Sequence, residues 1–274
     1  MRIEIGFTYD TEILYYNNTH IEVYMEFNSW EDFRKFKNDV KYSNRYIQSR
    51  EVKEFLFNIE ITLSKREYPL PSGAPLFRGQ IGCDELEIEG QLALSCFEPA
   101  RMKPLINKGT EGRGNPKGIS YLYLSDDENT ALSELRPHLD QYLSLAMFRT
   151  KRNLRIIDCI SKRKHYYFAE CVFNPPQSQD DITDAIWSMI NDAFSTPVTN
   201  LDNESDYVPT QILAELIKYN GYDGLCFKSS IGRGANFILF NLEDAEIINR
   251  KLMKPKTINY EFQEVKNPCK SNDF

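Results

Sequence analysis

Residues 112–137 join three kinds of local structure in direct succession, and this order constrains the fold around them. A glycine-rich turn contains Arg113, an alternating stretch that predicts a strand contains Tyr123, and an acid-capped stretch that predicts a helix contains Glu134. A guanidinium, a phenol and a carboxylate therefore lie on three consecutive elements. Such an order can bring all three groups around one ligand, which suggests an enzyme that handles a phosphate-bearing sugar.

Arg113 lies between Gly112 and Gly114, and Gly118 follows shortly after. Glycines let the backbone turn sharply and let a ligand approach it closely. A fixed arginine offers a forked donor that matches the oxygens of a phosphate or a carboxylate. The alternative is an arginine that is solvated on an ordinary turn.

Tyr123 and Glu134 also have structural alternatives. Tyr121 and Tyr123 are two residues apart on the predicted strand, so they share a face and could both be core residues. Glu134 lies near the C-terminal end of the predicted helix, where the helix dipole disfavours a carboxylate. This unfavourable place is a mild indication of function, although Glu134 could instead pair with His138 on the surface.

Ser229 and Ser230 follow an apolar, strand-like stretch and precede a glycine-containing loop over residues 232–234. Serines at a strand end can hydrogen-bond a sugar or a phosphate, or can serve as turn residues. Neither lies in the Gly-x-Ser-x-Gly motif of hydrolases. The loop is too short for a phosphate-binding loop or a dinucleotide fingerprint, so a bound nucleotide would need another fold.

The composition indicates a folded protein. The chain has 274 residues, of which 41% are hydrophobic and 13% aromatic, enough to form a sizeable core. Its formal net charge of -7 argues against a broad nucleic-acid-binding face, and we expect no direct contact with nucleic acid. No apolar run approaches the roughly 18 residues of a membrane span, and residues 1–10 lack the core of a signal peptide. We therefore expect a cytoplasmic protein.

The cysteines and histidines do not predict a metal site. The six cysteines are scattered without a Cys-x-x-Cys pair, and the three histidines are far apart. This spacing gives no support for zinc, so we expect no metal. We expect most of the cysteines to be small, buried apolar residues.

The N-terminal region differs from the rest of the chain. Residues 21–27 alternate and predict a strand, and Ser29 is expected to cap a helix that begins at Trp30. Apolar residues at helical spacing predict a second helix over residues 49–66. Prolines and a glycine over residues 69–75 then mark the best domain boundary.

The rest of the chain mixes strands and helices, so we expect an extension over residues 1–72, a main domain over residues 73–249 and a peripheral tail over residues 250–274. Residues 92–97 fit a helix or a strand, and residues 195–206 predict a polar loop. Strands are expected over 75–80, 119–124, 143–148, 154–158, 223–227 and 236–240, and helices over 128–135, 180–194 and 211–219, the last capped by Thr210.

Separate blocks of the sequence resemble the RES domain family, which is named for its arginine, glutamate and serine residues. They are Gly112-Arg-Gly-Asn-Pro-Lys-Gly with the following Tyr-Leu-Tyr-Leu, Thr130-Ala-Leu-Ser-Glu-Leu-Arg-Pro, and Tyr222-Asp-Gly-Leu-Cys-Phe-Lys-Ser-Ser with Asn236-Phe-Ile-Leu-Phe. Leu76-Phe-Arg-Gly resembles the opening strand of the family. The resemblance covers residues 73–245, and Ser29-Trp-Glu-Asp-Phe resembles the N-terminal extension of longer members.

The resemblance implies an α+β fold similar to that of ADP-ribosyltransferases, with a central cleft between β-structures. It implies an enzyme that breaks the nicotinamide–ribose bond of NAD, its substrate, with water or inorganic phosphate as the acceptor. Members act as intracellular toxins that an antitoxin with an Xre-like DNA-binding domain holds inactive. An ADP-ribosyltransferase that modifies a macromolecule and a non-catalytic interaction module are the alternatives, and a homo-oligomer is left open.

The resemblance also implies a role for each site residue. The arginine, tyrosine, glutamate and serine of the family fall on Arg113, Tyr123, Glu134 and Ser229, with Ser230 as the alternative serine, and the arginine of the opening strand falls on Arg78. Loss of nicotinamide leaves positive charge on the ribose, which Glu134 would stabilise. Arg78 and Arg113 would hold the pyrophosphate. Tyr123 would pack against nicotinamide or ribose, and Ser229 would orient the ribose or a phosphate.

Overall fold

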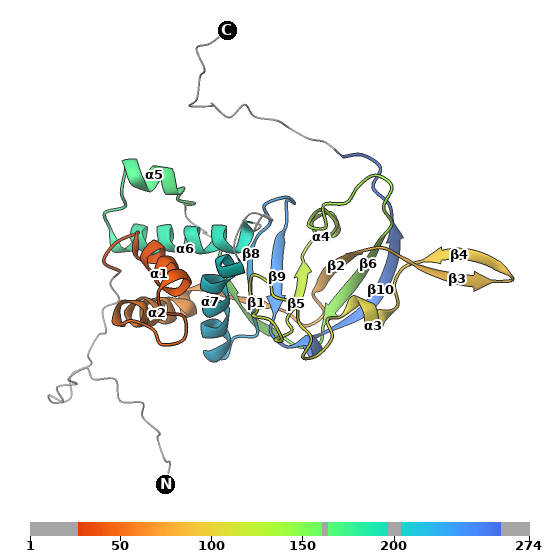
Figure 1. The fold of residues 1–274 in the computed structure, drawn as a ribbon, viewed down its shortest axis with the longest axis horizontal. Helices are drawn as coiled ribbons and strands as arrows, with labels where there is room; N and C mark the ends of the chain where they lie inside the picture. Colours follow the sequence, from red (N-terminus) through yellow and green to blue (C-terminus); the bar gives the residue numbers. More distant parts are fainter. Residues whose placement is uncertain (1–26, 161–163, 197–203, 259–274) are drawn as a thin grey trace, which may run out of the picture.

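The computed structural model describes residues 27–160, 164–196 and 204–258, and it confirms an α+β fold (Figure 1). Its centre is one sheet with the strand order β1-β7-β8-β9-β5-β2-β6-β10. β7 and β8 are parallel, and the other neighbouring pairs are antiparallel. The strands are β1 (Glu67–Leu70), β2 (Pro75–Ile81), β5 (Leu122–Ser125), β6 (Leu143–Thr150), β7 (Leu154–Asp158), β8 (Gly224–Lys228), β9 (Ala235–Leu239) and β10 (Ala245–Met253).

Most helices gather at one end of the molecule, and a hairpin projects from the other (Figure 1). The hairpin is β3 (Asp84–Ile88) paired with β4 (Gln91–Ser95). The helices are α1 (Asp32–Tyr42), α2 (Arg50–Thr62), α3 (Pro99–Met102), α4 (Glu128–Ser133), α5 (Phe168–Phe173), α6 (Gln179–Ser195) and α7 (Val208–Tyr219), with 3₁₀ turns at Leu63–Arg66, Glu204–Tyr207 and Leu242–Asp244. Of these, the short helix α4 lies over the sheet beside β2 and β5, away from the long helices.

Two hydrophobic clusters cover the two faces of the sheet. Along β5 and the residue before it the side chains alternate, so Tyr121 and Tyr123 pack in one cluster while Leu122 and Leu124 belong to the other. This confirms that the two tyrosines share a face. The first cluster also contains the apolar faces of α1, α2, α6 and α7.

The N-terminal helices form close to where the sequence predicts them. Ser49 caps α2 by accepting the Val52 amide, and the predicted helix ends in the 3₁₀ turn. The first helix begins at Asp32 rather than Trp30, because Ser29 instead forms a turn in which its hydroxyl accepts the Glu31 amide. Of the predicted strand over 21–27, all but Phe27 lies outside the described residues.

Residues 92–97, which the sequence left open between helix and strand, lie partly in β4. Two other regions depart from the sequence prediction. Thr210 does not cap α7, because the helix begins at Val208 and the Thr210 hydroxyl donates back to the Tyr207 carbonyl. Residues 197–203 of the predicted loop lie outside the described residues, and the part after them forms a 3₁₀ turn.

The sheet includes two edge strands that the sequence did not predict. β1 pairs with β7, and β10 pairs with β6 as far as Met253. The region expected to be a peripheral tail therefore begins inside the sheet, which corrects the prediction for residues 250–253, and residues 259–274 lie outside the described residues. The predicted division into domains stays a prediction, although the first cluster spans the proposed boundary.

The described cysteines fit the prediction of buried apolar residues only in part. Cys159, Cys171 and Cys226 are buried, whereas Cys83 and Cys96 are half-buried. Cys269 lies outside the described residues. Burial raises the pKa of Cys226 well above its usual value, which keeps that thiol protonated and unreactive near neutral pH.

We expect Phe55→Ala to destabilise the whole protein and not the N-terminal helices alone. Phe55 is 5% exposed and stacks on Phe36 with 4.8 Å between ring centroids, in the cluster that contains Trp187. Loss of a buried phenylalanine should lower the free energy of unfolding by about 3–5 kcal/mol. Urea unfolding followed by tryptophan fluorescence and by circular dichroism should show one shared, shifted transition.

Phe57→Ala is the matched control, because Phe57 lies on the same helix and is 51% exposed. This variant should change stability little. Two separate transitions in the Phe55→Ala protein would show instead that the N-terminal helices fold independently of the sheet.

Candidate active site

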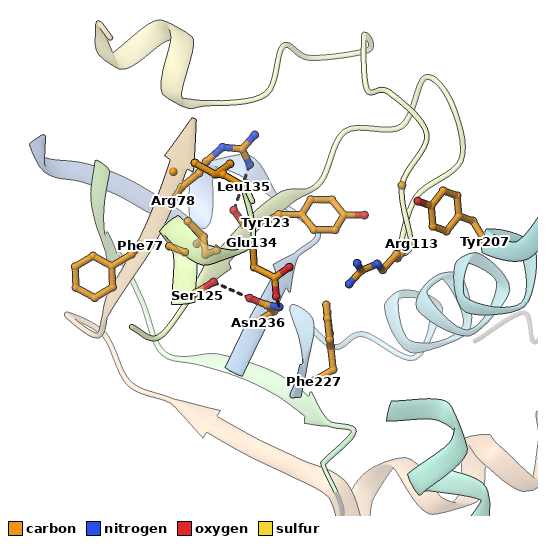
Figure 2. Close-up of a pocket in the computed structure, with 14 residues that line it drawn as sticks. Phe77, Arg78, Arg113, Tyr123, Ser125, Glu134, Leu135, Tyr207, Phe227 and Asn236 are labelled. Atoms are coloured by element: carbon orange, nitrogen blue, oxygen red, sulfur yellow. Dashed lines mark hydrogen bonds between the residues drawn. The ribbon is translucent and has the colours of Figure 1, made fainter. Parts of the chain in front are cut away.

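A cleft of about 350 Å³ opens between α4, the strands β2 and β5, and the loop that precedes β5 (Figure 2). This volume lies near the lower end of the roughly 300–1,000 Å³ typical of small-molecule sites. Of the predicted site residues, Arg78, Arg113, Tyr123 and Glu134 line it together, whereas Ser229 and Ser230 do not. The other lining residues are Phe77, Gly79, Gly112, Leu124, Ser125, Ala131, Leu135, Tyr207, Phe227 and Asn236.

Glu134 is brought to the cleft by a short, firmly anchored helix. Asp127 caps α4 by accepting the Thr130 amide at 2.7 Å, and Thr130 is buried. Gly79 lets α4 lie against β2, because a Cβ atom there would come within 2.8 Å of Leu135 Cδ1. Glu134 is the C-terminal cap residue of this helix.

The carboxylate of Glu134 is held by side chains from two other elements. Its Oε1 atom accepts hydrogen bonds from Ser229 Oγ at 2.7 Å and from Asn236 Nδ2 at 2.6 Å. These donors offset the unfavourable helix dipole at this position. Within the described residues Glu134 forms no ion pair with His138, so that alternative is wrong.

Ser229 and Ser230 lie differently. Ser229 is buried at the end of β8, and its hydroxyl oxygen accepts the amides of Ile231 and Gly232 while it donates to Glu134. Ser230 is exposed. Of the two candidate serines, Ser229 is therefore the one joined to the glutamate, and it reaches the cleft through that carboxylate.

The loop that carries Arg113 is fixed by side-chain amides. The Asn115 amide donates to the carbonyls of Thr110 at 2.8 Å and Ile119 at 2.7 Å. The Gln211 amide of α7 donates to the carbonyls of Gly112 at 3.0 Å and of Asn115 at 3.1 Å. Arg113 thus projects from a rigid turn rather than from an ordinary surface loop.

The glycines of this loop are required by close packing. A Cβ atom on Gly112 would lie 2.8 Å from the Tyr123 hydroxyl, and one on Gly114 would lie 2.7 Å from Ile238 Cδ1. Gly118 adopts φ +96°, a conformation that side chains disfavour. The predicted sharp turn is therefore present, and the first two glycines also bring the loop against β5 and β9.

Tyr123 joins the loop to the sheet. Its hydroxyl donates to Asn115 Oδ1 at 2.6 Å and accepts the Gly114 amide at 3.0 Å. Burial raises the pKa of Tyr123 to about 12, so the phenol stays protonated at neutral pH. Because the hydroxyl already makes these two hydrogen bonds, a ligand in the cleft would contact the ring of Tyr123.

Two arginines supply positive charge to the cleft from different sides. Arg113 Nη1 donates to the Phe194 carbonyl at the end of α6 at 2.8 Å, and Arg78 Nη1 donates to the Tyr123 carbonyl at 3.2 Å. The buried Arg78 Nε has no hydrogen-bond partner, and neither arginine forms an ion pair with any residue in the described parts of the chain. Burial lowers the pKa of Arg78, but arginine remains protonated in proteins. Both cations are thus available to an anionic ligand.

The sequence model of the RES domain family matches residues 96–260, which is more than half of the chain. This chain belongs to the RES domain family. The matched residues include Arg113, Tyr123, Glu134 and Ser229, whereas Arg78 precedes them. No curated protein gave a significant match to the sequence.

One solved structure matches part of this RES protein. It is the crystal structure of the MbcT–MbcA toxin–antitoxin complex of M. tuberculosis, with 11% identity and a TM-score of 0.39 over 72% of this chain and 92% of that chain. A likeness this distant carries no argument about function. Within the described residues, no helix is long and apolar enough to cross a membrane.

Sequence reasoning missed the polar residues that support this RES site. Asn236, Ser125, Asn115 and Gln211 form its side-chain network. Asn236 offered a signal, because an amide among the apolar residues of a predicted strand needs a partner when it is buried. The partner itself could not be named before β9 was placed beside β5.

We expect Tyr123→Phe to loosen the Arg113 loop and destabilise the protein. The change leaves the Gly114 amide and the buried Asn115 Oδ1 without a partner. An unsatisfied buried group costs about 1–3 kcal/mol, and urea unfolding should show a loss of this size. Tyr219→Phe is the control, because Tyr219 is 85% exposed. Equal stability of the two variants would contradict this account of the loop.

Proposed function

We propose that this RES protein degrades NAD by breaking the bond between nicotinamide and ribose. The observation that carries the proposal is a cleft lined by one carboxylate, Glu134, and by two arginines that have no acidic partner among the described residues. Two fixed cations suit a pyrophosphate, and one carboxylate suits a sugar that becomes positively charged.

The arginines would bind and orient the dinucleotide. Arg113 projects from the rigid loop and Arg78 from β2, so both guanidinium groups are held before a ligand arrives. Arginine matches phosphate oxygens through parallel hydrogen bonds. Binding the two phosphates between these residues would place the attached ribose near Glu134, which reduces the entropy cost of reaching the reactive geometry.

Glu134 would stabilise the ribose as nicotinamide departs. The carbon–nitrogen bond breaks, its electron pair leaves with nicotinamide, and positive charge develops on the sugar ring. A carboxylate beside the ring stabilises that charge and accepts hydrogen bonds from the ribose hydroxyls. The ring of Tyr123 would pack against the nicotinamide or ribose, and Ser229 would act on the ribose through Glu134.

The acceptor completes the reaction. Attack by water yields ADP-ribose and releases a proton, whereas attack by inorganic phosphate yields ADP-ribose carrying a new phosphate on the sugar carbon. NAD is the substrate in both reactions, with no prosthetic group required.

Product analysis tests this proposal directly. The purified protein is incubated with NAD, with and without inorganic phosphate, and the products are identified by mass spectrometry. Free nicotinamide together with ADP-ribose or its phosphorylated form supports the proposal. If the NAD is labelled, transfer of the label to a macromolecule would instead identify an ADP-ribosyltransferase. Unchanged NAD under all conditions would exclude NAD cleavage.

We further propose that the protein is an intracellular toxin held inactive by an Xre-like antitoxin. Membership of the RES family supports this role. The proposed activity supports it as well, because loss of NAD would stop growth. Induced expression should arrest growth and deplete NAD, and co-expression of a cognate antitoxin with an Xre-like domain should restore both. Growth arrest without NAD loss would separate the toxicity from the proposed chemistry.

We expect Glu134→Gln to abolish most NAD cleavage while the protein stays folded. The glutamine side-chain oxygen can still accept the hydrogen bonds of Ser229 and Asn236, so the local structure is retained. Loss of the negative charge should lower kcat by at least about 10²–10³-fold. Product release is measured together with the melting temperature, and full turnover in the folded variant would remove Glu134 from the mechanism.

We expect Arg113→Ala to raise KM for NAD and to lower kcat, because the guanidinium contributes to both binding and orientation. Loss of hydrogen bonds to a charged group should reduce kcat/KM by about 10- to 150-fold, which corresponds to about 1.5–3 kcal/mol. Arg45→Ala changes an exposed arginine and serves as the control. A normal KM and kcat in the Arg113 variant would place this residue outside the site.

A further inference from the structure

Ser125 and Asn236 form a buried pair beside Glu134. They are directly opposite each other on the antiparallel strands β5 and β9, and they are 3% and 8% exposed. Ser125 Oγ donates to Asn236 Oδ1 at 2.6 Å, and Asn236 Nδ2 donates to Glu134 Oε1 at 2.6 Å (Figure 2). Such cross-strand pairs are fixed by the register of the sheet.

The directions of these hydrogen bonds are determined by chemistry. An ionised carboxylate only accepts, so Asn236 must turn its NH₂ group toward Glu134 and its oxygen toward Ser125. The Ser229 oxygen already accepts the Ile231 and Gly232 amides, so its single hydrogen goes to Glu134. Each donor in the network therefore has one arrangement.

The two carboxylate oxygens of Glu134 differ in their hydrogen bonds. Oε1 accepts both donors, whereas Oε2 has no hydrogen-bond partner among the described residues. Glu134 itself lines the cleft. One oxygen is thus used to fix the side chain, and the other is left for a ligand.

We propose that Ser125 and Asn236 are positioning residues for Glu134, which hold Oε1 so that Oε2 is presented to the ribose of the substrate. This inference rests on the proposed function, because the substrate is NAD. Ser125 acts by orienting the Asn236 amide, and Asn236 acts by orienting the carboxylate. A catalytic group must be held near its productive geometry by supporting hydrogen bonds.

The first test separates positioning from binding. In Ser125→Ala the amide of Asn236 loses the donor that orients it, so kcat for NAD should fall by about 10- to 100-fold while KM changes little. Ser125→Thr keeps a hydroxyl on the strand and should restore most of the activity. Ser72→Ala, at an exposed position before β2, is the control. Unchanged kcat in folded Ser125→Ala, or an equal loss in Ser125→Thr, would overturn the role of Ser125.

The second test uses charge. Asn236→Asp replaces a donor by a carboxylate of the same shape at 2.6 Å from Oε1. The other titratable groups that line the cleft around this position are Arg78 on β2, Arg113, Tyr123 and Tyr207. Because two adjacent carboxylates cannot both ionise easily, the introduced carboxyl should bind a proton with a raised pKa.

The sign of the pH effect follows from this raised pKa. The protonated carboxyl can donate to Glu134 as the amide did, so the Asn236→Asp protein should resemble the wild type at acid pH. Its stability and its kcat should both fall relative to the wild type as the pH rises through the raised pKa. Asn44→Asp, at an exposed position, should follow the wild type throughout. A pH profile parallel to that of the wild type would contradict the proposal.

A double variant distinguishes failure of this inference from failure of the proposed function. Melting temperatures need no NAD. Glu134→Gln combined with Asn236→Asp should recover most of the stability that Asn236→Asp alone loses as the pH rises, because only one of the two adjacent carboxylates is left. If the double variant recovers stability but the wild-type protein leaves NAD intact, the network is upheld and NAD is rejected as the substrate. If the double variant does not recover stability but the wild-type protein cleaves NAD, only the network is rejected.

Discussion

The structure of the cleft depends on a carboxylate that its own helix does not favour. Glu134 caps the C-terminal end of α4, where the helix dipole repels negative charge, and donors from the residue after β8 and from β9 compensate. The position is tolerated only while α4 lies against these strands. Gly232 and Gly234 allow this contact, because a Cβ atom on either would come within 3.0 Å of Thr130.

The second constraint is the loop before β5, which reaches the cleft because its glycines lack side chains. Its position is set by Tyr123 from the sheet and by Gln211 and Phe194 from α7 and α6. A phosphate that binds Arg113 must therefore approach a guanidinium already held by the Phe194 carbonyl. This arrangement favours a ligand with several anionic oxygens, which can use the remaining donors without displacing that bond.

Helix caps and apolar periodicity predicted several helices from the sequence. The edge strands and the supporting residues of the site depend instead on pairing between distant segments. The helices with a serine or aspartate cap and an apolar stripe, such as α2, α4 and α6, lie close to their predicted ranges. The edge strands β1 and β10 were missed because half-exposed residues give a weak alternation. Arg113, Tyr123 and Glu134 could be named from motif spacing, but Asn236 and Ser125 became neighbours only through strand register.

The N-terminal helices contribute to the site at a distance. Phe36 of α1 and Phe55 of α2 belong to the cluster that holds α6 and α7, and these two helices fix the Arg113 loop. Trp187 strengthens this contact by donating to Thr62 at the end of α2 at 3.1 Å. The described part of the extension therefore supports the guanidinium through the packed core, and none of its described residues lines the cleft.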